Sequence, residues 1–251
     1  MKQYEYRRNY ELEQKYWWFV GLRKIIKVLL DLSGGVGREM RVLDVGCGTG
    51  ALLNELSAKA DYVVGLDNSS EALDFCRLRG HENLVKADGA FLPFGDEEFD
   101  LVTAIGVIEH ISDDSRFLSE LQRVLKKNGR LILMTSSFGF LWTQADVAND
   151  HKRRYYLRAL EKKIHRHGFS TLRFSHFNFV LFPALAAMLI GHRLFKGLNS
   201  PKPERILPLP PSPINRVLTL VLTLEAKLIK WFRLPWGISM IGVFQKKATT
   251  A

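Results

Sequence analysis

The sequence predicts an α/β fold, in which a mostly parallel sheet carries helices on both faces. Short apolar runs alternate with helical segments between residues 41 and 135, and each run has the length of a buried strand. The chain has 251 residues, of which 47% are hydrophobic and 25% are charged, as in an ordinary folded protein. This length suits one large domain, or one domain that carries an insertion.

Elements of the first half follow from spacing and turn signals. Apolar residues at helical spacing predict one helix over residues 11–32, which Ser33, Gly34 and Gly35 end. Strands and helices then alternate as a parallel sheet requires. The expected strands cover residues 41–45, 62–66, 83–87, 99–105 and 129–135, and the expected helices between them cover residues 49–58, 70–78 and 113–125.

The pattern changes after residue 140, where helices and apolar stretches predominate. The expected elements are a helix at 155–167, a strand at 171–176, an apolar stretch at 177–195 with Pro183, a proline-rich loop at 200–213, a helix at 214–232 and a strand at 238–244. We therefore predict four parts: a helical cap (1–36), a core (37–176), a helical, basic and apolar insertion (177–236), and a last core strand with a tail (237–251).

Charge is distributed unevenly along the chain. The whole chain has a net charge of +10, but residues 41–140 hold 10 basic and 16 acidic residues, whereas residues 141–251 hold 18 basic and 5 acidic ones. A basic second half indicates an anionic partner, such as a phosphorylated substrate, a membrane surface or a nucleic acid.

The cysteine content indicates the cellular compartment and whether a metal site is expected. The two cysteines, Cys47 and Cys76, belong to no cluster with metal-ligand spacing, so a zinc site and a disulfide framework are disfavoured. The first residues also lack the apolar run of a signal peptide. These observations predict a cytoplasmic protein that binds no metal.

A glycine-rich turn carries the functional argument. The predicted first strand leads into Asp44-Val45-Gly46-Cys47-Gly48-Thr49-Gly50, and glycines let the backbone turn tightly and approach a ligand. Asp67 ends the next predicted strand, where a carboxylate takes ribose hydroxyls. A dinucleotide is one candidate ligand. The spacing GxGxG and the carboxylate of Asp44 argue against a pyrophosphate, whereas a cationic ligand such as S-adenosylmethionine would tolerate that carboxylate.

Residues 42–50 resemble the first motif of class I S-adenosylmethionine-dependent methyltransferases, in the small-molecule branch that includes the ubiquinone and biotin-pathway enzymes. Residues 65–69, 86–94, 99–110 and 125–131 resemble the later motifs in order. The resemblance implies a Rossmann-like, seven-stranded sheet whose last strand is antiparallel. It also implies these cofactor-binding residues: Asp44, Gly46, Cys47, Gly48, Gly50, Asp67, Asn68, Asp88, Gly89, Ala90 and Ile105.

Five further residues are candidates for chemistry or binding. His110 follows the fourth predicted strand, and His151 follows the fifth, so either is a candidate base for an acceptor proton. Arg153 and Arg154 are candidates for an anion clamp on the acceptor. Arg23 is a candidate for the cofactor carboxylate. For each of these residues, packing or a solvated surface position is the alternative interpretation.

A second resemblance concerns the acceptor. Residues 17–24, 151–155 and 177–183 resemble segments of methyltransferases that act with glycan and lipid-glycan pathways. The stretches 177–195 and 214–232 are apolar but carry charges, which favours a surface helix over a membrane span. We therefore expect methyl transfer to an oxygen or nitrogen of an amphipathic small molecule, such as a lipid-linked sugar, at or near an anionic membrane surface. RNA methylation, NAD-dependent oxidoreduction and non-catalytic membrane binding are the alternatives.

Overall fold

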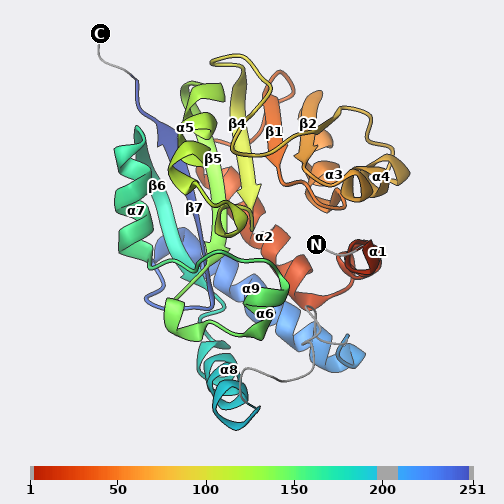
Figure 1. The fold of residues 1–251 in the computed structure, drawn as a ribbon, viewed down its shortest axis with the longest axis vertical. Coiled ribbons are helices and arrows are strands. Elements are labelled where there is room, and N and C mark those ends of the chain that lie inside the picture. Colours follow the sequence, from red (N-terminus) through yellow and green to blue (C-terminus); the bar gives the residue numbers. More distant parts are fainter. Residues whose placement is uncertain (1–2, 197–208, 249–251) are drawn as a thin grey trace.

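The computed structural model describes residues 3–196 and 209–248 (Figure 1). Its centre is a seven-stranded sheet with the order β3-β2-β1-β4-β5-β7-β6, in which β7 runs antiparallel to both of its neighbours. The predicted mixed sheet with an antiparallel last strand is confirmed. The strands are β1 (Arg41–Val45), β2 (Tyr62–Asp67), β3 (Leu84–Lys86), β4 (Phe99–Ile105), β5 (Leu125–Ser136), β6 (Phe169–Phe177) and β7 (Ser239–Lys246).

Helices cover both faces of the sheet, as the sequence predicts. The α-helices are α1 (Gln3–Leu12), α2 (Trp17–Leu32), α3 (Ala51–Ser57), α4 (Ser70–Leu78), α5 (Asp114–Val124), α6 (Gln144–Ala148), α7 (Leu157–Arg166), α8 (Phe182–Lys196) and α9 (Ser212–Trp231). Helices α5 and α7 pack on one face, and α2, α3, α4 and α9 pack on the other.

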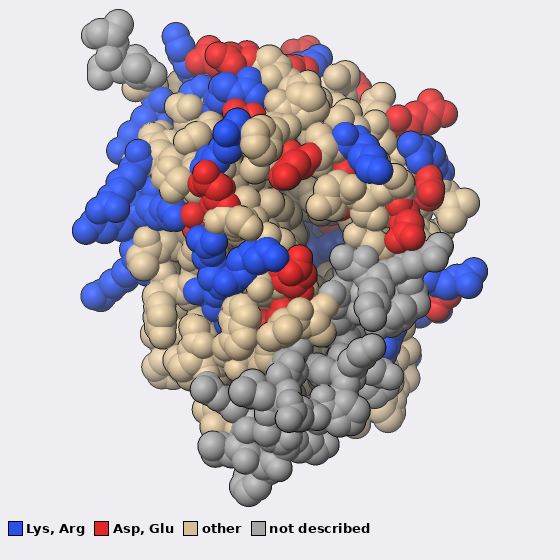
Figure 2. All heavy atoms as spheres, in the orientation of Figure 1, with Lys and Arg blue, Asp and Glu red and all other residues tan. Residues whose placement is uncertain are grey.

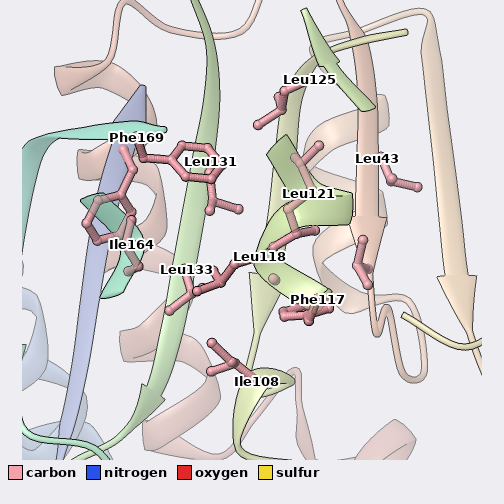
Figure 3. Packing of buried hydrophobic residues seen from close by; sticks show 14 of the residues in the cluster. Leu43, Ile108, Phe117, Leu118, Leu121, Leu125, Leu131, Leu133, Ile164 and Phe169 are labelled. Carbon is pink, nitrogen blue, oxygen red and sulfur yellow. The ribbon is translucent and has the colours of Figure 1, made fainter. Parts of the chain in front are cut away.

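Side chains of successive strand residues point to opposite faces of the sheet, and this alternation explains why the protein has a hydrophobic core on each face. Val42 and Leu101 face α2 and α3, whereas Leu43 and Val102, one residue further on, face α5. Figure 3 shows the second of these layers, in which side chains of α5 and α7 meet those of β5. Because both faces are buried, the central strands read as continuous apolar runs.

The N-terminal part departs from the prediction. The single helix expected over residues 11–32 is wrong, because α1 ends at Leu12 and α2 begins at Trp17. Glu13 lies in the break, where its buried carboxylate accepts a hydrogen bond from Thr49 Oγ1 (2.7 Å) and pairs with Arg79. These partners lie far away in the sequence, so helical spacing alone could not reveal the break.

The region after β6 contains α8 and α9, as expected for the segment between the last two strands. Residues 200–208 of the predicted proline-rich loop lie outside the described residues, and α9 begins at Ser212 rather than at Ile214. Pro213 is compatible with the first helical turn, where no partner is needed for a backbone N–H. Among the described residues, no helix is long and apolar enough to cross a membrane.

Candidate functional site

The glycine turn follows β1 at the carboxyl edge of the sheet. Gly46, Gly48 and Gly50 have φ values of +70°, +55° and +84°, which favour glycine over residues with side chains. A Cβ on Gly46 would also lie 2.4 Å from Val107 Cγ2. The backbone N–H groups of Gly46 and Cys47 donate to Leu66 O. The backbone of the turn is therefore hydrogen-bonded to β2. Gly48 leaves open space beside the turn, because it has no side chain.

Asp67 ties the end of β2 to the same turn. Its carboxylate accepts hydrogen bonds from Gly48 N (3.0 Å) and Ser69 N (2.9 Å), and burial raises its pKa. Asn68, the next residue, is exposed. A carboxylate held by the backbone at this strand end has the position that a ribose-binding acid requires.

Asp44 lies beneath the turn and is almost completely buried. Thr103 Oγ1 donates a hydrogen bond to its carboxylate (2.5 Å). Burial raises the pKa of Asp44 to about 7, the hydrogen bond from Thr103 opposes this effect, and the charge of Asp67 adds to it. A carboxyl group with such a pKa changes its charge near neutral pH, and a bound cation would favour the ionised form.

The remaining predicted cofactor residues lie near the carboxyl ends of the strands. Asp88 is exposed after β3, and its Oδ1 accepts a hydrogen bond from Ala90 N (2.8 Å). A Cβ on Gly89 would lie 3.1 Å from Phe117, which leaves little room for a side chain. Ile105 ends β4 and is half-buried, and Cys47 packs with its sulfur 3.9 Å from that of Cys76.

These features fit S-adenosylmethionine. The three glycines of the turn have no side chains and so allow the close approach of an adenosyl ligand, and the carboxylate of Asp67 has the place that an acid for the ribose hydroxyls would take. The second carboxylate, Asp44, suits a ligand that carries positive charges, as a sulfonium and an ammonium group do. The contacts of the individual residues with the cofactor stay predictions.

The two candidate histidines lie together near the ends of β4 and β5. The rings of His110 and His151 meet edge to face, with their centroids 4.7 Å apart. His151 Nδ1 lies 2.9 Å from Asp146 Oδ1, and a carboxylate accepts hydrogen bonds, so Nδ1 carries the proton. Nε2 of His151 is then the basic nitrogen. Burial, and then the charge of His151, lowers the pKa of His110 to about 4, which keeps that ring neutral at neutral pH.

The candidate arginines have protein partners. Arg154, whose side chain is 8% exposed, forms a two-point ion pair with Asp146, at 2.7 and 3.0 Å. Arg153 is more exposed; it pairs with Asp114 (3.2 Å) and donates to Ser112 O (2.6 Å). Arg23 pairs with Glu55 (2.9 Å) on α3. Arg154 thus positions the partner of His151, and Arg153 is the more accessible candidate for an anion.

Sequence reasoning did not identify two features of this edge. The first is Asp146, which joins His151 to Arg154 and accepts further hydrogen bonds from Thr143. The second is Phe138, which lies two residues after the end of β5, has a φ of +59° and contacts an aromatic group. That group comprises Phe140, Tyr156, His176 and Phe182. The position of Phe138 just past a parallel strand was a usable signal, because ligands bind at that edge.

Polar atoms without partners accompany the aromatic group. Among the described residues, Ser137 Oγ, His176 Nε2 and Asn178 Oδ1 are buried and make no hydrogen bond. Ser137 follows β5, His176 lies at the end of β6, and Asn178 follows that strand. Buried polar atoms without partners are rare in proteins, and a bound molecule with polar groups would satisfy them.

Comparisons with known proteins agree with this site. Residues 43–133 match the family described as "Methyltransferase domain". The chain is 34% identical over 116 residues to the demethylmenaquinone methyltransferase of Thermotoga maritima, covering 45% of this chain and 48% of that protein. It is 33% identical over 116 residues to a ubiquinone biosynthesis O-methyltransferase of Xanthomonas oryzae pv. oryzae, covering 44% and 46%. The chain thus spans about half the length of the curated relatives it matches.

A solved structure supports the fold over nearly the whole chain. A chain from the complex of the Haloferax volcanii Trm112 methyltransferase activator with a methyltransferase aligns with a TM-score of 0.63. The alignment covers 98% of this chain and 96% of that chain at 15% identity, so it shows the fold alone. The family match thus identifies residues 43–133 as a methyltransferase domain, and the strand order around them is the one implied by the resemblance to class I methyltransferases, whose methyl donor is S-adenosylmethionine.

Proposed function

We propose that the protein transfers a methyl group from S-adenosylmethionine to an oxygen or nitrogen atom of an amphipathic small molecule. The observation that carries the proposal is the glycine turn at the carboxyl edge of the sheet, with Asp44 beneath it and Asp67 beside it. The match to the methyltransferase family over residues 43–133 covers this turn and supports the proposal.

In the proposed reaction the cofactor supplies an electrophilic methyl group on a sulfonium. The chain's part is to bind and orient both partners and to accept a proton. The acceptor oxygen or nitrogen forms the new bond to the methyl carbon while the carbon–sulfur bond breaks, which leaves S-adenosylhomocysteine. Nε2 of His151 takes the proton that the acceptor loses, since Nδ1 is already protonated toward Asp146.

Three observations favour an amphipathic acceptor. The aromatic group around Phe138 offers an apolar contact surface beside the unpartnered polar atoms of Ser137 and Asn178. The second half of the chain is strongly basic, and Figure 2 shows Lys and Arg side chains gathered on the side where α7 lies. The names of the relatives, which concern demethylmenaquinone and ubiquinone biosynthesis, fit a small-molecule acceptor of mixed polarity. A lipid-linked sugar or a lipid-like head group has these properties.

Calorimetric titration with S-adenosylhomocysteine and with NAD tests the cofactor. We expect S-adenosylhomocysteine to bind and the D67A variant to lose at least about tenfold in affinity, because a hydrogen-bonded carboxylate is removed from the ribose position. The matched control is D61A, which removes an exposed carboxylate paired with Arg38. Binding of NAD without binding of S-adenosylhomocysteine would contradict the proposal.

Transfer of labelled methyl groups to host extracts tests the acceptor. We expect the label in the organic phase after incubation with membrane extract. An aqueous small molecule or RNA as the labelled product would contradict an amphipathic acceptor and leave methyl transfer standing.

The R153A variant tests the anion clamp once an acceptor is known. If Arg153 binds an anionic group of the acceptor, R153A should raise the KM for that acceptor. K127E is the control: Lys127 lies at the opposite edge of the sheet, and its reversal changes the charge by an equal or larger amount.

A further inference from the structure

Helix α9 exposes an apolar stripe on the side away from the protein core. Its buried face consists of Leu222, Glu225, Ala226 and Ile229, which pack against α2 and the sheet or hold the turn after β6. The stripe residues recur every three or four positions, so they share one face of the helix, and each is 40–71% exposed. They are Ile214, Val217, Leu220, Leu224, Leu228 and Trp231.

Basic residues lie along one side of this stripe. Arg216, Lys227 and Lys230 are exposed, and at 100° per residue they fall between the apolar stripe and the buried face. The acidic residue of α9 is Glu225, and it is buried, where its carboxylate accepts hydrogen bonds from Phe179 N (3.0 Å) and Val180 N (2.9 Å). The exposed surface of α9 thus combines apolar side chains with positive charge alone.

The stripe lies at the functional end of the molecule. Figure 1 shows α8 and α9 beyond the tips of β4 and β5, the edge at which the glycine turn and the histidine pair lie. The apolar surface continues past the end of α9, because Phe232 and Trp236 are 62% and 45% exposed. A surface that receives α9 would therefore also adjoin the acceptor side of the site.

The charges decide between the possible occupants. An anionic bilayer offers negative head groups above an apolar layer, which complements an apolar stripe flanked by cations. A second copy of the chain would place like charges opposite each other, since residues 141–251 hold 18 basic and 5 acidic residues. Lying flat, a helix of 20 residues would contact the bilayer over about 30 Å.

We propose that α9 docks in the plane of an anionic membrane surface, with its apolar stripe among the acyl chains and Arg216, Lys227 and Lys230 beside the head groups. The inference deepens the proposed function, on which it rests for its purpose: docking would bring the acceptor edge of the sheet to a lipid-like substrate. Docking itself needs no methyl transfer, so it can be measured separately.

Co-sedimentation of the full chain with phosphatidylcholine vesicles, with and without phosphatidylglycerol, tests the docking surface. We expect binding that requires phosphatidylglycerol and weakens with salt. L224E should reduce partitioning at least about tenfold, since it replaces an inserted apolar side chain by a charge. L78E is the matched control, because Leu78 is 70% exposed at the end of α4, away from the stripe.

Charge reversal provides a second pair of variants. K227E/K230E should lose most of the phosphatidylglycerol-dependent binding, whereas K127E/K247E, which reverses two exposed lysines at the opposite edge of the sheet, should retain it. The proposal is overturned if the wild type does not bind the vesicles or if L224E and L78E behave alike. Light scattering after gel filtration measures the oligomeric state and so tests a second copy of the chain as the occupant. A dimer that L224E dissociates, without vesicle binding, would assign the stripe to a second copy.

Titration with S-adenosylhomocysteine on the same preparations separates the two proposals. Cofactor binding without vesicle binding would overturn the docking surface and leave the proposed function standing. Vesicle binding without cofactor binding would overturn the proposed function and leave the docking surface standing. All the variants lie outside the glycine turn and the histidine pair, so their affinity for S-adenosylhomocysteine should equal that of the wild type.

Discussion

At the scale of single residues, the burial of Asp44 costs stability and prepares a site for a ligand with positive charge. A carboxylate without a cationic partner is costly in this position, and burial therefore raises its pKa to about 7. A neutral Asn would accept the same hydrogen bond from Thr103 at no such cost. The choice of Asp is explained by a ligand that brings positive charge, because sites built for ligands often cost stability in their absence.

The D44N variant tests this interpretation. In the wild type, Asp44 keeps its proton up to about pH 7 in the folded state but loses it near 3.8, the ordinary value, when unfolded. The folded state of the wild type therefore loses stability as the pH rises between these values. Relative to the wild type, D44N should gain up to about 4 kcal/mol in free energy of unfolding across this window, measured by urea denaturation at several pH values.

The affinity for S-adenosylmethionine should show the opposite trend. It should rise through about pH 7 in the wild type, as Asp44 ionises, and stay nearly constant in D44N. T103V is a useful companion, since it removes the hydrogen bond and keeps the carboxyl group. A pH-dependent affinity that persists unchanged in D44N would show that another group titrates.

Asp146 is the second residue whose role a substitution can define. D146N replaces one acceptor oxygen by an N–H donor and removes the negative charge that favours the Nδ1–H form of His151, so the ring should shift toward the other tautomer, and methyl transfer should fall about 100-fold or more. Long-range proton–nitrogen NMR spectra of the imidazole report the tautomer. Since loss of the ion pair with Arg154 weakens packing, affinity for S-adenosylhomocysteine serves as the measure of an intact fold.

Two outcomes separate positioning from mere packing in this case. If His151 is the base, D146N should lower kcat with an altered tautomer but preserved cofactor affinity, and D61N, on the exposed Asp61–Arg38 pair, should change neither. A drop in activity with the wild-type imidazole spectrum would remove Asp146 from the mechanism.

At the scale of elements, α2 and α9 pack closely against each other. A Cβ on Gly21 would lie 2.4 Å from Leu222 Cδ1, so glycine is required for the two helices to come together. The contact anchors α9, whose exposed stripe we propose as a docking surface. It also joins segments about 200 residues apart, as do the hydrogen bonds from Lys24 to Thr223 and between Asn215 and Trp17.

We expect G21A to lower the free energy of unfolding by about 1–3 kcal/mol, because the added methyl group overpacks this contact. Gly37 is the matched control: nothing lies within 4 Å of a Cβ at that position, and its φ is not positive, so G37A should be nearly neutral. In the L222G background, which removes the Cβ of Leu222 (2.5 Å from a Cβ at Gly21) together with the rest of its side chain, G21A should cost much less. Equal costs in both backgrounds, measured by urea denaturation, would rule out the contact as the cause.

At the scale of the whole molecule, the last strand completes the sheet from within. β7 pairs with β5 through residues 130–136 and with β6 through residues 169–177. Without it, β5 becomes an exposed edge and β6 has no neighbour among the described strands. The matched family region, residues 43–133, therefore depends on residues more than 100 positions further along the chain.

Truncation tests this dependence. A chain of residues 1–236 should lose cooperative thermal unfolding and aggregate, because an unpaired apolar strand edge associates readily with other chains. A chain of residues 1–248 keeps β7 and should unfold like the full chain. A cooperative transition in the shorter chain, seen by calorimetry, would show that β7 is dispensable.

The sequence by itself determined the class of fold, the position of each strand within a few residues, the glycine turn and the likeness to methyltransferases. These properties are local: strand length, alternation and turn chemistry are written in contiguous residues, and the strands Arg41–Val45 and Phe99–Ile105 show this most directly. The positions of His110 and His151 after two strands were also readable, because parallel strands end at one edge.

Only the tertiary structure decided what depends on residues distant in the sequence. The N-terminal helix is divided where Glu13 contacts Thr49 and Arg79. Asp146 is the hydrogen-bond partner of His151, and Arg154 forms an ion pair with the same carboxylate. The tertiary structure also separated the buried face of α9 from the exposed stripe, which the apolar composition of 214–232 could not do. The physical reason is common to all of these: burial and pairing energies depend on which side chains the fold brings together, and a linear pattern records only neighbours along the chain.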